Sequence, residues 1–204
     1  MDTGKQNTRG SLFNQKYFDG YTRRITLRDG RLRSQFVYEG TVYTPRAGAP
    51  AWRRAKGFCL LLWAAHTALL LAALAQKIPA NRMRGVAALG AAAVLCALGL
   101  AALTALRLMT GTRLTQWEYR MAAVSLKELA GLAAVFALAL ACCAAFVPAA
   151  TGTEFSPAAL ACALGSGAAA LAEVRLLAAE RYDAAPSEER PSGIDLTADF
   201  ERGN

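Results

Sequence analysis

The chain has 204 residues and a formal net charge of +8, with 54% hydrophobic and 19% charged residues. This composition excludes an intrinsically disordered protein, which would contain fewer apolar residues. It also excludes a small secreted module stapled by disulfides, because all five cysteines lie inside apolar stretches rather than among polar loops.

Charged residues are absent from four long stretches, which are residues 57–76, 85–106, 129–153 and 155–172. At about 1.5 Å per residue, a helix of such length crosses a hydrocarbon core of about 30 Å. Prolines 148 and 157 are expected to mark helix limits on either side of a short loop. The sequence predicts an all-α membrane protein, a four-helix transmembrane bundle with spans at residues 57–76, 85–106, 129–148 and 157–174.

A short β-structure is expected before the first span. Residues 21–44 alternate between apolar and polar side chains, and Asp29-Gly30 and Glu39-Gly40 are typical two-residue hairpin turns. The pattern therefore predicts a β-hairpin extended to a three-stranded meander.

The turn at Asp29-Gly30 fixes the strand register, because it sets Leu27 opposite Leu32 and Arg28 opposite Arg31. One face of the meander is then mostly apolar and contains Tyr21, Ile25, Leu27, Leu32, Phe36, Tyr38 and Tyr43. The opposite face is basic and contains Arg24, Arg28, Arg31 and Arg33.

Residues 1–20 are expected to form a flexible N-terminus, and residues 45–56 a basic linker that contains Arg53, Arg54 and Lys56. These three residues and the arginine face are candidate contacts for anionic phospholipid headgroups or a protein partner. Nucleic acid is the less favoured partner, because arginines beside a membrane are already explained by topology and lipid charge. A solvated cap that only directs topology, docking on the protein's own loop, and dimerisation remain alternatives.

The distribution of basic residues predicts the orientation of the chain. All but three of the 23 lysines and arginines fall on the side of the membrane that holds both termini. The exceptions are Lys77, Arg82 and Arg84. Because cytoplasmic loops are rich in Lys and Arg, both termini are predicted to be cytoplasmic, most simply in a prokaryotic plasma membrane.

Two further cytoplasmic segments follow. Within the loop of residues 107–128, Trp117, Met121 and Val124 share one helix face, which predicts an amphipathic helix leading into the third span. Residues 175–204 form an acidic tail that is expected to be flexible. Its apolar residues are candidates for a docking peptide, or for a contact with the protein's own arginine face; they are Ile194, Leu196 and Phe200.

Few polar side chains lie within the spans. His66, Thr67 and Thr104 form a candidate intramembrane polar site, since an ionisable residue inside a membrane marks function by default. The alternative is a histidine that is bonded to a backbone carbonyl or a neighbouring helix. Glu173 and Arg175 are expected to reach the membrane interface by snorkelling.

The cysteines allow one specific hypothesis. Cys142 and Cys143 should lie at the same depth as Cys162 in the next span, so a disulfide from either one to Cys162 is a candidate. The alternative treats them as small apolar residues, because the sequence lacks the C-x-x-C pair of a thiol oxidoreductase.

No catalytic motif, cofactor-binding loop or metal-binding set occurs in the sequence. We therefore expect a non-enzymatic accessory or scaffold subunit that binds a partner through its hairpin and tail. The alternative is a small transporter or channel protomer that works as a homo-oligomer and uses His66.

Overall fold

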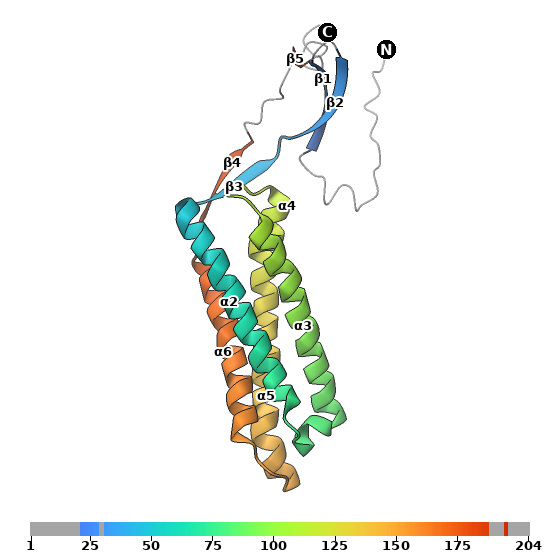
Figure 1. The fold of residues 1–204 in the computed structure, drawn as a ribbon, viewed down its shortest axis with the longest axis vertical. Helices are drawn as coiled ribbons and strands as arrows, with labels where there is room; N and C mark the ends of the chain where they lie inside the picture. The colour runs from blue at the N-terminus through green and yellow to red at the C-terminus, as the bar shows by residue number, and fades with distance from the viewer. Residues whose placement is uncertain (1–20, 29–30, 188–193, 196–204) are drawn as a thin grey trace, which may run out of the picture. The chain divides into compact units, whose positions relative to one another are not determined.

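The computed structural model describes residues 21–28, 31–187 and 194–195 and shows a mostly helical protein with short strands (Figure 1). Four helices are long and apolar enough to cross a membrane, as the sequence predicted. The third of them is continuous with two short segments before it, α4 (Gln116–Tyr119) and the π-helical η2 (Arg120–Ser125). The four helices are α2 (Gly48–Ala75), α3 (Arg84–Met109), α5 (Leu126–Thr151) and α6 (Pro157–Ala179).

The predicted linker of residues 45–56 is mostly helical, so that boundary was wrong. Helix α2 begins at Gly48 and carries Arg53, Arg54 and Lys56 on its first three turns. Pro50, which is inside the predicted linker, lies in the first turn of this helix. Backbone N–H groups there have no intrahelical acceptor, so a proline removes no hydrogen bond.

The helix limit expected at Pro148 was also wrong. Pro148 lies inside the last turns of α5, which ends at Thr151. Gly152 follows in the left-handed conformation (φ 67°), a geometry that terminates helices. The predicted start of α6 is confirmed, because the Ser156 hydroxyl accepts a hydrogen bond from the backbone N–H of Ala159 at 3.2 Å.

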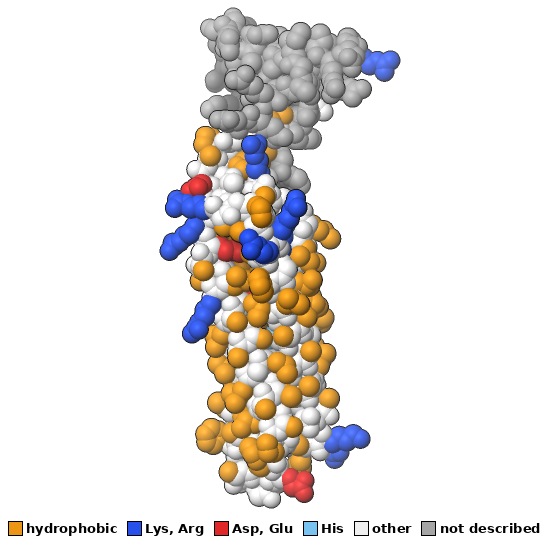
Figure 2. Space-filling view, turned by 60° about the vertical axis from the view of Figure 1, so that its left-hand side comes forward, with side chains coloured by type: hydrophobic (Ala, Val, Ile, Leu, Met, Phe, Trp, Pro, Cys, Tyr) orange, Lys and Arg blue, Asp and Glu red, His pale blue; other side chains and the backbone are white. Residues whose placement is uncertain are grey.

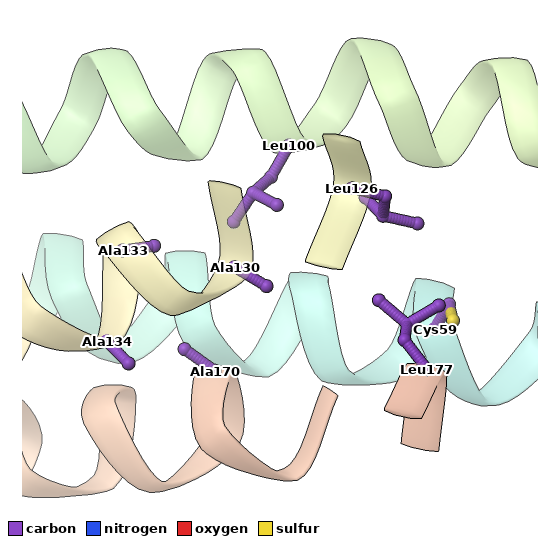
Figure 3. Packing of buried hydrophobic residues seen from close by; sticks show 8 residues of the cluster. All are labelled: Cys59, Leu100, Leu126, Ala130, Ala133, Ala134, Ala170 and Leu177. Atoms are coloured by element: carbon purple, nitrogen blue, oxygen red, sulfur yellow. The ribbon is translucent and has the colours of Figure 1, made fainter. Parts of the chain in front are cut away.

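The four long helices pack as one bundle, in which α6 contacts α2 and α5, and α3 contacts the same two helices. The interior is rich in alanine. In one cluster, Cys59, Leu126 and Leu177 converge from α2, α5 and α6 (Figure 3). Small residues allow close helix contact here, since a Cβ added at Gly165 would lie 3.1 Å from Leu69 Cδ1.

The outer surface of the bundle is a broad apolar belt, with basic side chains gathered mainly toward one end of it (Figure 2). Large apolar side chains on all four helices point outward, among them Leu61, Leu95, Val135 and Leu164. In water such a surface would be costly, whereas in lipid it is the ordinary exterior of a multi-pass membrane protein.

The described residues form two compact units: the bundle unit (residues 44–114 and 118–183) and a strand unit that holds most of the remaining residues. In the strand unit, β1 (Tyr21–Arg28) pairs antiparallel with β2 (Arg31–Tyr38). The predicted register is confirmed, because Leu27 pairs with Leu32 and Arg28 with Arg31.

The predicted three-stranded meander was wrong. The third strand, β3 (Thr41–Pro45), pairs with β4 (Tyr182–Pro186) of the tail and not with β2. A second tail strand, β5 (Ile194–Asp195), pairs with the free edge of β1, which gives the order β2-β1-β5. The tail thus supplies strands, although Leu196 and Phe200 lie outside the described residues.

Candidate functional site

The most polar part of the bundle unit is at the end where α2 begins and α3 and α6 finish. The Arg107 cluster there consists of Trp52, Lys56, Arg107, Glu180 and Tyr182. The guanidinium of Arg107 is the centre of this cluster and is 0% exposed, although the sequence placed Arg107 in a cytoplasmic loop.

Arg107 contacts three different elements. Its Nη1 donates to the backbone carbonyl of Ala122 at 2.8 Å, and its Nη2 forms an ion pair with Glu180. The guanidinium lies 4.4 Å from the ring centroid of Trp52, a cation–π contact. Ala122 belongs to the π-helical segment η2, a distortion that is often found at functional sites.

Both carboxylate oxygens of Glu180 are engaged. Glu180 follows the last residue of α6, and the Tyr182 hydroxyl donates to its Oε2 at 2.6 Å. The Tyr182 ring meets Trp52 and Tyr119 edge to face, with centroid distances of 6.1 and 5.0 Å. Burial, and then the bond to Glu180, raise the pKa of Tyr182 well above its usual value. The chain that leaves α6 is therefore bound to α2, α3 and α4.

Lys56 caps the end of α3. Its Nζ donates to the carbonyl of Leu108 at 3.2 Å and to that of Thr110, and it lies 5.3 Å from the Trp52 ring centroid. Trp52 contributes to the same helix end by donating from Nε1 to Gly111 at 2.9 Å. A cation at a helix C-terminus is favourable because it meets unsatisfied carbonyl groups.

Lys56 therefore differs in exposure from the other predicted headgroup contacts. Arg53, Arg54 and Arg31 are exposed, whereas Lys56 is buried. For Arg24, Arg28 and Arg33, the strand register shows only that their positions share one face of the hairpin.

Glu173 does not reach the interface, so the snorkelling prediction was wrong for this residue. It is 0% exposed, and neither of its carboxylate oxygens has a hydrogen-bond partner. The Nε of Arg107 and the hydroxyl of Thr104 are also buried without a partner. Arg107 nevertheless interacts electrostatically with Glu173, so a second carboxylate lies near the guanidinium.

His66 is bonded to helix α6 through Ser166. Its Nδ1 lies 2.9 Å from the Ser166 hydroxyl and 3.1 Å from the Ser166 carbonyl oxygen. The same hydroxyl donates to the backbone carbonyl of His66 at 3.1 Å. Because a carbonyl can only accept, the contact with the Ser166 carbonyl is a hydrogen bond when Nδ1 carries the ring proton. This is the arrangement in which a neighbouring helix satisfies the ring.

The structure does not join the three predicted intramembrane residues by hydrogen bonds. His66 Nε2 and the hydroxyls of Thr67 and Thr104 are buried and have no partner. Ser166 is the actual partner of His66, and no sequence pattern distinguishes it from the other polar residues of the spans.

All five cysteines are free thiols. Cys143 and Cys162 pack against the same apolar cluster, which agrees with the depth that was expected for them, while Cys142 is exposed. Within residues 21–28, 31–187 and 194–195, no group of three or more His, Cys, Asp or Glu residues is placed to hold a metal ion.

A pocket at the opposite end of the bundle is lined by apolar residues of all four helices and by Asn81. Its volume is about 10 Å³, which is room for about one water molecule.

No protein-family model, curated protein or solved structure matches this chain significantly.

Proposed function

We propose that this protein is a non-enzymatic accessory or scaffold subunit of a membrane, and that it binds a partner protein through the β1–β2 hairpin and the tail. The observation that carries the proposal is strand pairing between the two ends of the chain: β1 pairs with β5, and β3 pairs with β4. Segments before the first span and after the last one thus build sheets together.

Two features support a binding role for these strands. Ile25 and Leu32 belong to the apolar face of the hairpin and are 40% and 68% exposed. A hairpin becomes stable only when an apolar face is covered. In addition, the two described residues of β5 pair with Thr26 and Leu27, so this edge of β1 accepts an extended segment.

The proposed location is a prokaryotic plasma membrane with both termini in the cytoplasm. The excess of Lys and Arg on the side of the termini supports this orientation. Exposed Arg53 and Arg54 would then meet anionic headgroups, with each contributing about 1 kcal/mol. Alkaline phosphatase fused after residue 80 should be active and fused after residue 204 inactive; the reverse result would contradict the orientation.

The partner is tested with the full-length chain. Tagged wild-type protein is cross-linked in native membranes and purified, in parallel with a variant in which Arg24, Arg28, Arg31 and Arg33 are all changed to Gln. The matched control changes Lys77, Arg82 and Arg84 to Gln at the other end of the bundle. We expect one protein to be recovered in fixed stoichiometry with wild type and control and to be lost with the arginine variant. Equal recovery from all three would contradict the proposal.

The transporter hypothesis keeps one supporting observation, the buried and unpartnered Nε2 of His66. In that case, His66→Gln would abolish flux of a substrate in proteoliposomes while Cys59→Ser would leave it unchanged. Identical flux in wild type and His66→Gln would remove the histidine from consideration.

A further inference from the structure

Arg107 has two carboxylates within electrostatic range, and it is bonded to one of them. Glu180 holds Nη2, while Glu173 has no hydrogen bond at all. Glu173 and the guanidinium are both 0% exposed. A buried carboxylate with no hydrogen bond is rare, because its desolvation is not compensated.

The geometry of the helices brings both carboxylates toward the same guanidinium. Helices α3 and α6 both run toward the Arg107 end, and side chains lean toward the N-terminus of their own helix. Glu173 lies on the same face of α6 as Glu180, two turns nearer the N-terminus of that helix. Seven residues separate Glu173 from Glu180, about 10.5 Å along a helix, which two glutamate side chains and a guanidinium between them can span.

Arg107 and Glu173 both have atoms that could form a second ion pair. The Nε of Arg107 has no acceptor, and both oxygens of Glu173 have no donor. Between the two glutamates on this face of α6 lies Leu177, which packs beside Cys59 (Figure 3). Cys59 is itself fully buried.

We propose that Arg107 exchanges between Glu180 and Glu173, and that Glu173 holds the buried guanidinium when the chain beyond Ala179 leaves the bundle. In the state described by the structure, Glu180 and Tyr182 fasten the start of the tail to α2 and α3. In the second state, the Arg107–Glu173 pair keeps the buried charge neutralised and frees Glu180 and Tyr182. Two alternative partners thus make the attachment of the tail a two-state element.

Which glutamate holds Arg107 would then depend on whether the tail is attached to the bundle. A partner that pulls on β4 would release Glu180, and the bundle would stay folded because Glu173 replaces it. This use of the switch rests on the proposed function, whereas the exchange itself needs no partner and is measured on the isolated protein.

Trypsin cleavage after Arg181 measures the released state. The Arg181 carbonyl accepts a hydrogen bond from the backbone N–H of Arg46 at 3.0 Å, so cleavage there requires local opening. In full-length protein in nanodiscs, Glu180→Gln should raise the cleavage rate at least about tenfold. Glu173→Gln should lower it below the wild-type rate, because the released guanidinium loses its second partner. Glu128→Gln, an exposed carboxylate on α5, is the matched control and should not change the rate.

The thermal unfolding midpoint in detergent provides the second test. Each single variant keeps one partner for Arg107, while the double variant Glu173→Gln/Glu180→Gln keeps neither. Its midpoint should therefore fall by more than the sum of the two single shifts. Additive shifts, or a wild-type cleavage rate in Glu173→Gln, would overturn the proposal. If the double variant does not fold, the cleavage rate of Glu173→Gln alone decides. Either outcome leaves the partner-binding experiment unaffected.

Discussion

Two clusters of buried polar side chains in the bundle are built very differently. At the level of His66, one histidine and one serine on two helices bond reciprocally among alanines and leucines. At the Arg107 end, a guanidinium, an ammonium, a carboxylate, a phenol and an indole connect three helices, the π-helical segment and the start of the tail. The first arrangement fixes two helices, whereas the second couples the bundle to the segment that leaves it.

Removing Arg107 should have the largest effect. Arg107→Met keeps much of the side-chain volume but leaves Oε1 of Glu180 and the carbonyl of Ala122 without their donor. We expect a loss of about 3–5 kcal/mol in the free energy of unfolding, measured by chemical denaturation in micelles. Arg175→Met, at an exposed position of α6, is the control and should change stability by less than about 0.5 kcal/mol.

A double substitution sharpens this expectation. In Arg107→Met/Glu180→Met both charges are gone, so most of the loss should be recovered, because the penalty comes mainly from the charge that is left unpaired. A double variant as unstable as Arg107→Met would show that the cluster stabilises the bundle by packing rather than by charge pairing.

Tyr182→Phe should have an intermediate effect. It removes the hydroxyl that bonds to Glu180 Oε2 but retains the ring contacts with Trp52 and Tyr119, and we expect a loss of about 1.5 kcal/mol.

The pH dependence of the wild type is a second check on Tyr182. Its pKa is raised in the folded state, so its stabilising contribution is complete below the ordinary tyrosine pKa of about 10 and declines as the pH rises above that value. Tyr182→Phe should lack this alkaline decline. An identical pH profile in both proteins would contradict the assignment.

Ser166→Ala should have a smaller effect. It removes the hydroxyl bonds to His66, but the Ser166 backbone carbonyl still lies 3.1 Å from Nδ1. Hydrogen bonds between membrane helices contribute about 0.6 kcal/mol on average, so we expect a loss near that value. Ser156→Ala removes the N-terminal cap of α6 and should lower the free energy of unfolding by about 1 kcal/mol, so it gives a reference for the same assay. A loss several times larger than this cap effect would make the His66 level as important as the Arg107 end.

Arg46→Gln should have the smallest effect. Its Nε forms an ion pair with Asp183 at 2.6 Å, but both side chains are more than 60% exposed. Such pairs contribute about 0–1 kcal/mol and weaken with salt. Stability should therefore be nearly unchanged at physiological ionic strength, and a clear loss would indicate that this pair belongs to the Arg107 cluster.

The success of the sequence-based predictions followed the range of the interactions involved. The four helices long and apolar enough to cross a membrane and the Leu27–Leu32 register depend on neighbouring residues, through uninterrupted apolar runs and a tight turn. These predictions were confirmed. The meander failed because β3 had two candidate partners, and the one it pairs with lies near the other end of the chain. Arg107 and Glu173 were misplaced because their position in sequence, at the edge of an apolar run, suits an exposed residue as well as a buried one.

The sequence by itself determined how many times the chain can cross a membrane and how its hairpin turns, because hydrophobic length and turn chemistry are local properties. Only the tertiary structure decided which charged residues are buried. Arg107 is enclosed because Trp52 and Glu180, distant in sequence, are brought to it by the packing of α2, α3 and α6 into one bundle. A polar group's environment depends on what packs around it, and that packing exists only in the folded bundle.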